Sequence, residues 1–135
     1  MFITFILGLL SYASGPNTQT GTNPVRSYAG ELSGNSTTTL TTVPTTEDYL
    51  ITDVLFTSQN YTCYSAYKLQ NANGDILGAF RMQARSDTYD YATSTATVQH
   101  SFRSGIVIPA GTVLSLVHTG TCETSYVLSG ALVKP

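Results

Sequence analysis

A chain of 135 residues is long enough for one domain with a single hydrophobic core. Only 10% of its residues are charged and the formal net charge is -2. These values exclude the clustered Lys and Arg side chains that a nucleic-acid surface needs. Thr, Ser, Asn, Gly and Tyr are plentiful instead, and Thr and Tyr favour pleated sheets.

The first thirteen residues, MFITFILGLLSYA, are almost entirely apolar. A membrane-spanning helix needs about 20 apolar residues, so the segment is too short for a stable membrane span. A signal peptide has an apolar region of this length and residues 11–13 resemble its cleavage site, but the positively charged start is missing. As an extended strand, the segment would place four large side chains on one face. These are Ile3, Phe5, Leu7 and Leu9.

We favour a third interpretation of residues 1–13, an assembly arm that adds to another copy of the chain as a strand. An apolar helix bundled with the helices of neighbouring copies is the alternative. Residues 14–24, SGPNTQTGTNP, contain glycine and proline but no large apolar residue, and predict a flexible linker to a domain over 25–135. If every copy gives one arm and receives one, the contact builds a filament or a ring.

After the linker, short strand-like runs alternate with turn signals, and no apolar stripe of helical period and useful length appears. The predicted strands span 25–32, 36–43, 49–58, 62–70, 76–84, 95–102 with a continuation at 106–108, 112–119 and 125–133. About eight short strands at this spacing predict an all-β fold, an antiparallel β-sandwich that is jelly-roll-like.

The run over 49–58 has the strongest strand signal. Simple alternation places Leu50, Val54 and Phe56 on one face. Ile51 and Leu55 then lie on the other face. Because both faces are apolar, we predict a central strand.

Two cysteines, Cys63 and Cys122, are too few for a zinc site, and neither histidine lies at metal-ligand spacing from them. The pair is compatible with one disulfide, within a chain or between chains, and buried free thiols are the alternative. A disulfide implies an extracellular or cell-surface location. We expect no metal and no cofactor.

The polar loop over 85–94 contains the candidate ligand site. Its two carboxylates and two tyrosines suit calcium or a sugar ring, and binding residues often lie on such loops. These residues are Asp87, Tyr89, Asp90 and Tyr91. A solvated loop whose tyrosines pack over the sheet edge is the simpler interpretation. The three tyrosines between residues 61 and 67 also suit carbohydrate stacking, and for them we expect sheet packing.

Asp53, His100 and Ser101 have the residue types of a hydrolytic set. Nothing in the sequence places them together, and the G-x-S-x-G motif of a nucleophile elbow is missing. We therefore predict that the protein is not an enzyme, and that Asp53 accepts hydrogen bonds from a neighbouring loop.

Asn71, Asn73 and Asp75 alternate like calcium ligands, but the distant Glu of an EF-hand loop is missing. We interpret the stretch as a hairpin turn. Asn73-Gly74 at its centre predicts a type I′ turn, which needs positive φ at both central residues.

Three segments in order carry a resemblance to a known group: TVPTTEDYLITDVLFTS, FRSGIVIPAGTVLSL, and YVLSGALV after a cysteine. They resemble small secreted bacterial β-sandwich domains, which share a V-P opening before I-T-D-V, an F-x-x-G-I-V-I-P-A-G middle and a Y-x-x-S-G-x-L-V close. The resemblance covers about residues 42–133. It implies the fold and export but no activity, so no functional residue is carried over.

These observations predict an extracellular structural subunit that self-assembles into a fibre or pilus-like filament through strand donation by residues 1–13. The alternative is a trimeric fibre tip or adhesin that binds surface glycans through loops such as 85–94. The first would form long polymers and the second closed trimers. In both cases we expect a homo-oligomer whose main partners are copies of the same chain. We expect no binding of nucleic acid.

Overall fold

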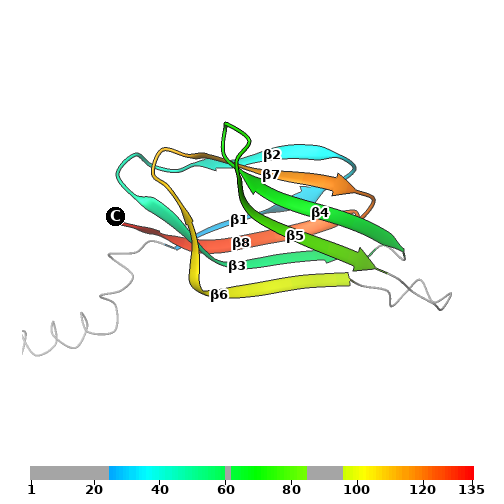
Figure 1. Cartoon of the computed structure of the whole chain (residues 1–135). Helices are drawn as coiled ribbons and strands as arrows, with labels where there is room; N and C mark the ends of the chain where they lie inside the picture. Colours follow the sequence, from blue (N-terminus) through cyan, green and yellow to red (C-terminus); the bar gives the residue numbers. More distant parts are fainter. Residues whose placement is uncertain (1–24, 60–61, 85–95) are drawn as a thin grey trace, which may run out of the picture.

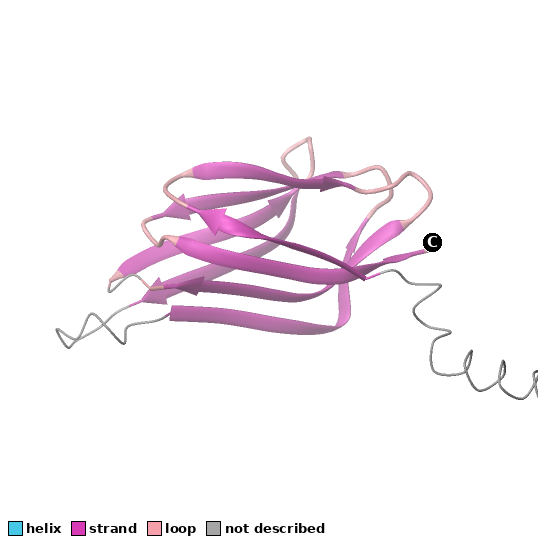
Figure 2. Ribbon diagram, turned by 180° about the vertical axis from the view of Figure 1, so that it is seen from behind, coloured by secondary structure: helices cyan, strands magenta, loops and turns pink. Residues whose placement is uncertain are grey.

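A computed structural model describes residues 25–59, 62–84 and 96–135. Within these ranges the chain forms eight strands and no helix (Figure 1), and the strands make two sheets packed face to face (Figure 2). The strands are β1 (Val25–Leu32), β2 (Ser36–Thr42), β3 (Asp48–Ser58), β4 (Cys63–Gln70), β5 (Ile76–Ala84), β6 (Ala96–Ile108), β7 (Val113–Gly120) and β8 (Thr124–Val133). The predicted all-β sandwich is confirmed, and the two runs predicted around 103–105 are one strand, β6.

The order of the strands is that of a jelly roll. Sheet A has the order β1-β8-β3-β6 and sheet B the order β2-β7-β4-β5, with all neighbours antiparallel. Only the β4–β5 hairpin joins neighbours within one sheet, and every other connection crosses between the sheets (Figure 1). This winding of two four-stranded sheets is the jelly-roll arrangement.

The core lies between the two sheets. Along β4 and β8 nearly every second side chain is buried, as the two-residue period of a strand requires. At its centre the ring of Phe56 from sheet A stacks on the ring of Tyr67 from sheet B, with centroids 4.1 Å apart. Tyr49 is also fully buried, and its hydroxyl donates to the carbonyl of Arg26 at 3.1 Å. Burial, together with the nearby Tyr28 hydroxyl, raises the pKa of Tyr49 to about 12.

A β-bulge at Thr52 in β3 changes which residues face the core. Ile51 is buried before the bulge, and Val54 and Phe56 are buried after it, so the alternation shifts by one residue. The predicted faces were therefore wrong, because Leu50 points away from the core that Val54 and Phe56 enter. The predicted central position is confirmed, since β3 lies between β8 and β6.

Glycines in the two neighbouring strands make room for this bulge. In β6, residues 102–105 have no partner in β3, and Gly105 has a φ of 71°. A side chain at Gly105 would overlap the side chain of Leu50, and a side chain at Gly130 in β8 would overlap the Leu50 carbonyl oxygen. The backbone of Gly130 thus lies very close to that of Leu50. Both glycines allow β3 to change its register without losing its neighbours.

Replacing Gly130 by Ala should therefore force β3 and β8 apart. We expect Gly130→Ala to lower the free energy of unfolding by roughly 1–3 kcal/mol, the usual effect of overpacking. Gly78→Ala is the matched control, because a Cβ there would meet its nearest neighbour at 3.4 Å. It should be neutral or stabilising by up to about 1 kcal/mol. Urea denaturation of both variants measures the difference, and equal stabilities would contradict this account of the bulge.

Candidate functional site

The strand ends that border four connections of the chain lie at one end of the sandwich, which we call the disulfide end. Strand pairing places Leu32 beside Thr124 and Cys63 beside Ala84, and Ala96 lies in the same region beside Ser58. The connections that leave from these residues are 33–35, 59–62, 85–95 and 121–123. A ligand site at this end can therefore draw on several parts of the sequence at once.

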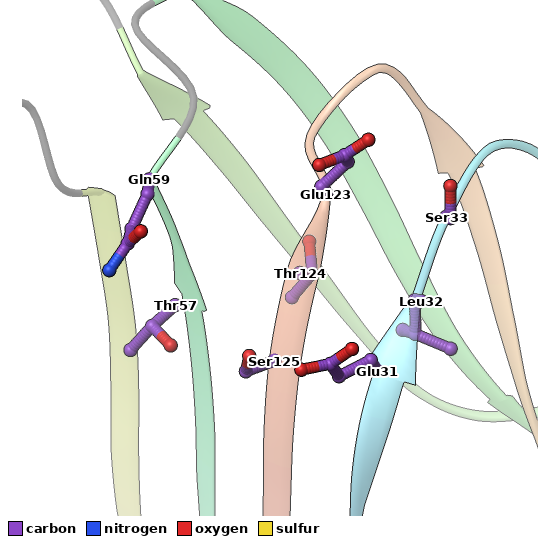
Figure 3. A pocket seen from close by; sticks show the side chains of 8 residues that line it. All are labelled: Glu31, Leu32, Ser33, Thr57, Gln59, Glu123, Thr124 and Ser125. Atoms are coloured by element: carbon purple, nitrogen blue, oxygen red, sulfur yellow. The ribbon is translucent and has the colours of Figure 1, made fainter. Parts of the chain in front are cut away.

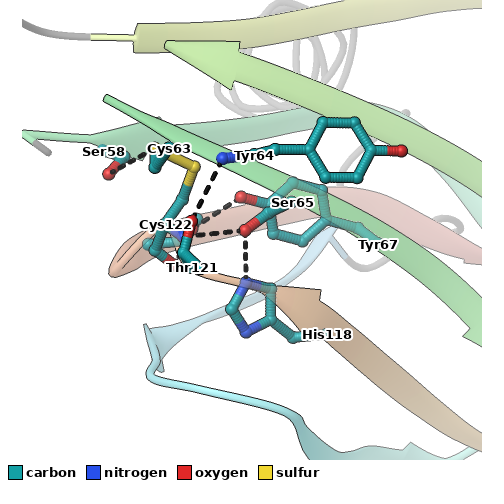
Figure 4. Close-up of a disulfide and its surroundings, with 9 residues drawn as sticks. Ser58, Cys63, Tyr64, Ser65, Tyr67, His118, Thr121 and Cys122 are labelled. Carbon is teal, nitrogen blue, oxygen red and sulfur yellow. Dashed lines mark hydrogen bonds between the residues drawn. A yellow bond between two sulfur atoms is a disulfide. The ribbon is translucent and has the colours of Figure 1, made fainter. Parts of the chain in front are cut away.

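Cys63 and Cys122 form a disulfide between the start of β4 and the β7–β8 connection (Figure 4). Their Cα atoms are 5.0 Å apart, and both residues are buried. The predicted pair is confirmed as a bond within one chain, and neither cysteine is free. The bond joins residues 59 positions apart. A cross-link closing a loop of this length stabilises a fold by about 4 kcal/mol in the chain-entropy model.

A buried hydrogen-bond network surrounds the disulfide (Figure 4). Ser65 Oγ accepts the backbone N–H of Cys122 at 3.0 Å and lies 2.8 Å from His118 Nε2. The other ring nitrogen of His118, Nδ1, contacts the carbonyl of Gly34. Because a carbonyl only accepts, Nδ1 carries a hydrogen, and Ser65 has its own hydroxyl hydrogen to donate to Nε2. The network joins the β1–β2 connection, β4, β7 and the β7–β8 connection.

A second chain of hydrogen bonds extends this network to β8. The Thr124 hydroxyl donates to the carbonyl of Cys122 at 3.1 Å, so the Tyr67 hydroxyl, 2.6 Å away, is the donor to Thr124. Burial raises the pKa of Tyr67, against the opposite effect of the nearby hydroxyl groups of Thr124 and Ser65. Burial also raises the pKa of Tyr126. The Tyr67 hydroxyl thus stays protonated at neutral pH and acts as a donor.

A polar cleft of about 580 Å³ opens at the disulfide end (Figure 3). Its lining residues are Glu31, Leu32, Ser33, Thr57, Gln59, Glu123, Thr124 and Ser125. Glu31, Ser125 and Thr57 form one row across β1, β8 and β3. The described lining residues contain hydroxyl, amide and carboxylate groups. These groups can bind a ligand that carries hydroxyl or cationic groups.

Two of the predicted functional segments lie outside the described residues. The first is the candidate ligand loop with Asp87, Tyr89, Asp90 and Tyr91, and the second is the arm with Ile3, Phe5, Leu7 and Leu9, together with the linker over 14–24. The structure does place the two ends of the loop. β5 ends at Ala84 and β6 begins at Ala96, both at the disulfide end that carries the cleft.

Strand pairing brings two members of the Asp53, His100 and Ser101 set together. Ser101 Oγ donates to Asp53 Oδ1 at 2.6 Å, and Thr52 Oγ1 donates to Oδ2 at 2.7 Å. These hydrogen bonds lower the pKa of Asp53, and the one from Ser101 has the larger effect. We predicted that a neighbouring loop would donate hydrogen bonds to Asp53. The donor across the sheet is instead Ser101, a residue of β6. His100 faces sheet B, where its ring lies 5.9 Å from that of Phe80. Because successive strand residues face opposite sides, His100 and Ser101 cannot act on one substrate.

Asn71, Asn73 and Asp75 shape the β4–β5 hairpin. Asn71 Oδ1 accepts the backbone N–H groups of Asn73 and Asp75 at 2.9 Å each. The predicted type I′ turn is wrong, because Gly74 has a φ of 85° whereas Asn73 has no positive φ. The Gly74 N–H donates to the Asn71 carbonyl, so Ala72 and Asn73 are the central residues of the turn. The Asn71 side chain stabilises this five-residue loop in place of a two-residue turn.

The expected sheet packing of the tyrosines is seen for Tyr67, and the described residues form no tyrosine platform. Tyr64 is half exposed on sheet B, while Tyr67 is buried in the core. Tyr61 lies outside the described ranges. In those same ranges no three His, Cys, Asp or Glu side chains gather closely enough to hold a metal ion. No helix found there is long and apolar enough to cross a membrane.

The sequence did not indicate the cleft. Its residues come from three strands and three connections, and they meet only because β8 pairs with β1 on one side and β3 on the other. Glu31 and Ser125 are 94 positions apart in the chain, as 125 − 31 shows. No local motif marks such a row.

The described residues form one eight-stranded jelly roll with a disulfide at one end. No protein-family model matches the sequence, and no curated protein is significantly similar to it. Among solved structures, this chain is similar to one in the capsid asymmetric unit of cyanophage Pam1. The alignment covers 84% of this chain and 87% of the capsid chain, with 11% sequence identity and a TM-score of 0.47. A structure of infectious bursal disease virus, Gx strain, has 15% identity and a TM-score of 0.36. That alignment covers 84% of this chain but only 33% of the longer viral chain. At these values the likeness carries no conclusion about function.

The disulfide makes a direct prediction. Alkylation of the denatured, unreduced protein should label no thiol, and alkylation after reduction should label both cysteines. Reduction should lower the free energy of unfolding by roughly 2–5 kcal/mol, because it releases the constraint on the unfolded chain. A Cys63→Ser, Cys122→Ser double variant is the control and should be equally unstable with and without reductant. A ladder of linked chains on a non-reducing gel would contradict the pairing within one chain.

Proposed function

We propose that this protein is an extracellular structural subunit that self-assembles into a fibre or pilus-like filament through residues 1–13. The observation that carries the proposal is a core formed between two sheets by residues from Leu32 to Leu132, together with an apolar run at 2–10 of the sequence. Such a run promotes aggregation when water surrounds it. A second copy of the chain is a partner that can cover it in a defined way.

The disulfide supports the extracellular location, because such bonds form and persist in oxidising compartments. The resemblance of residues 42–133 to small secreted domains agrees with export. We also infer a role without catalysis. Among the described residues, the set with hydrolytic residue types is divided between two faces of sheet A, with Ser101 bonded to Asp53 and His100 turned toward sheet B.

Deleting residues 1–13 should give a folded, soluble chain that no longer assembles. A single charge, Phe5→Asp or Leu7→Asp, should block assembly nearly as well, because an unpaired carboxylate is costly in an apolar contact. Each fully buried Phe or Leu side chain contributes roughly 1.5–3 kcal/mol to such a contact. Electron microscopy and light scattering measure the assemblies, and circular dichroism checks the fold.

Thr18→Asp places the same charge in the linker and serves as the matched control, so it should assemble normally. If the deletion variant forms the same assemblies as the full chain, the arm is not the connector and the proposal fails.

The second candidate function is a trimeric fibre tip or adhesin that binds surface glycans. The observation that favours it is the polar cleft at the disulfide end, where the loop over 85–94 leaves β5 and returns to β6. Hydroxyl and carboxylate groups such as those of Glu31 and Ser125 match the hydroxyl groups of a sugar. This function requires closed trimers in place of long polymers.

A glycan array tests this second function. Tyr89→Ala and Asp90→Ala should abolish binding of any glycan that the full chain recognises, with little change in melting temperature. Tyr64→Ala alters an exposed tyrosine on sheet B and should leave binding unchanged. A full chain that binds no glycan on a broad array, and shows no thermal shift with calcium, would leave the loop without a ligand role.

A further inference from the structure

The four edge strands of the sandwich differ in regularity. β2 has an unpaired residue, Leu40, β5 has an extra residue, Leu77, and β6 has the unpaired stretch 102–105. β1 alone pairs with its neighbour through eight consecutive residues without a register shift. Its other edge has no strand partner in the part of the chain that the structure describes.

This difference matters because bulges protect an edge strand from pairing with another chain. β1, with the sequence VRSYAGEL, has no bulge and no proline. Its charged residues, Arg26 and Glu31, lie near its two ends and leave 27–30 uncharged. Eight residues of strand offer an edge of about 27 Å for hydrogen bonding. The free edge of β1 is therefore the one best suited to accept a further strand.

The packing of the core on this side also suits an added strand. On the far side of the sandwich, β5 and β6 approach each other closely, whereas β1 and β2 do not approach to the same degree. Tyr28 of β1 and Leu40 of β2 pack against the core but are only partly buried. At Gly30 the hydroxyl of Tyr126 lies where a side chain would be. A strand beside β1 would have an apolar surface under one of its faces.

We propose that β1 accepts residues 1–13 of a neighbouring copy as a fifth strand of sheet A. The inference rests on the proposed function and names the surface that receives the arm. Every odd-numbered residue of the arm from 3 to 9 is large and apolar, which suits a strand that turns this face toward the open side of the core. The residues for the core-facing side are Ile3, Phe5, Leu7 and Leu9. Phe2, Thr4, Ile6, Gly8 and Leu10 fall on the opposite side.

The length of the linker allows the arm to reach another copy. Residues 14–24 span at most about 36–40 Å when fully extended. The linker joins the domain at Val25, the first residue of β1, so every copy presents its arm and its acceptor edge at the same strand. Arm and edge are different surfaces, so the contact is heterologous and repeats from copy to copy.

Photo-crosslinking of the full chain tests this inference. A benzophenone side chain is placed at Ala29 in β1 or, as the matched control, at Thr39 in β2. Both residues are exposed on edge strands on the same side of the sandwich. Light and heavy isotope forms are mixed before assembly, so that mass spectrometry separates links between chains from links within one chain. We expect position 29 to link to residues 1–13 of another chain and position 39 not to.

Amide hydrogen exchange gives a second readout. Assembly should protect part of the amides of 25–32 and leave those of 36–42 unchanged, because only β1 gains a neighbour. Links from position 29 to residues 1–13 of the same chain would overturn the inference and remove support for the proposed function. Arm-dependent assembly with equal links from positions 29 and 39, or none from 29, would overturn the inference alone. A full chain that never assembles would overturn both.

Discussion

The bulge at Thr52 is the constraint on which the core of sheet A depends. Without it, strand alternation would send Ile51 to the opposite face from Val54 and Phe56, and one end of the sheet would lose its apolar inner face. The Tyr67 ring of sheet B, which stacks on Phe56, would then face a sheet that is apolar over only half its length. The bulge occurs where small residues in the neighbouring strands allow it. Gly130 in β8 and Gly105 in β6 both lie against the residue before Ile51.

The two ends of the sandwich are stabilised by different chemistry. At the disulfide end, a covalent bond and a buried polar network centred on Ser65 join four segments of the chain. At the opposite end, the β4–β5 loop is stabilised locally by the side chain of Asn71. A satisfied buried network specifies one arrangement of its members, because any displaced donor would lose its partner away from water. The cleft and the loop over 85–94 are therefore attached to the end with the more strongly constrained strands.

The same kind of irregularity that shapes the core also makes the edge strands of the two sheets differ, and the proposed assembly depends on this difference. The stretch 102–105 that completes the bulge of β3 also interrupts the outer edge of β6. Irregularities at Leu40 and Leu77 do the same for both edges of sheet B. β1 keeps a regular ladder with β8, and it is the strand that follows the linker in the sequence. This difference between the edges is the basis for proposing that an added strand pairs with β1 and not with the other three edge strands.

The sequence by itself determined the strands, because two-residue alternation and turn residues act over a few positions. Seven of the eight predicted strands end within one residue of the observed strand, and the eighth continues through 103–105 into the run at 106–108. The cysteine pair was compatible with the disulfide that the structure contains. Only the tertiary structure decided the faces of β3, the Asp53–Ser101 contact and the row of Glu31 and Ser125 in the cleft. It also decided the uninterrupted edge of β1. These features depend on the register between strands far apart in the chain, and a single unpaired residue such as Thr52 changes that register without leaving a local signal in the sequence.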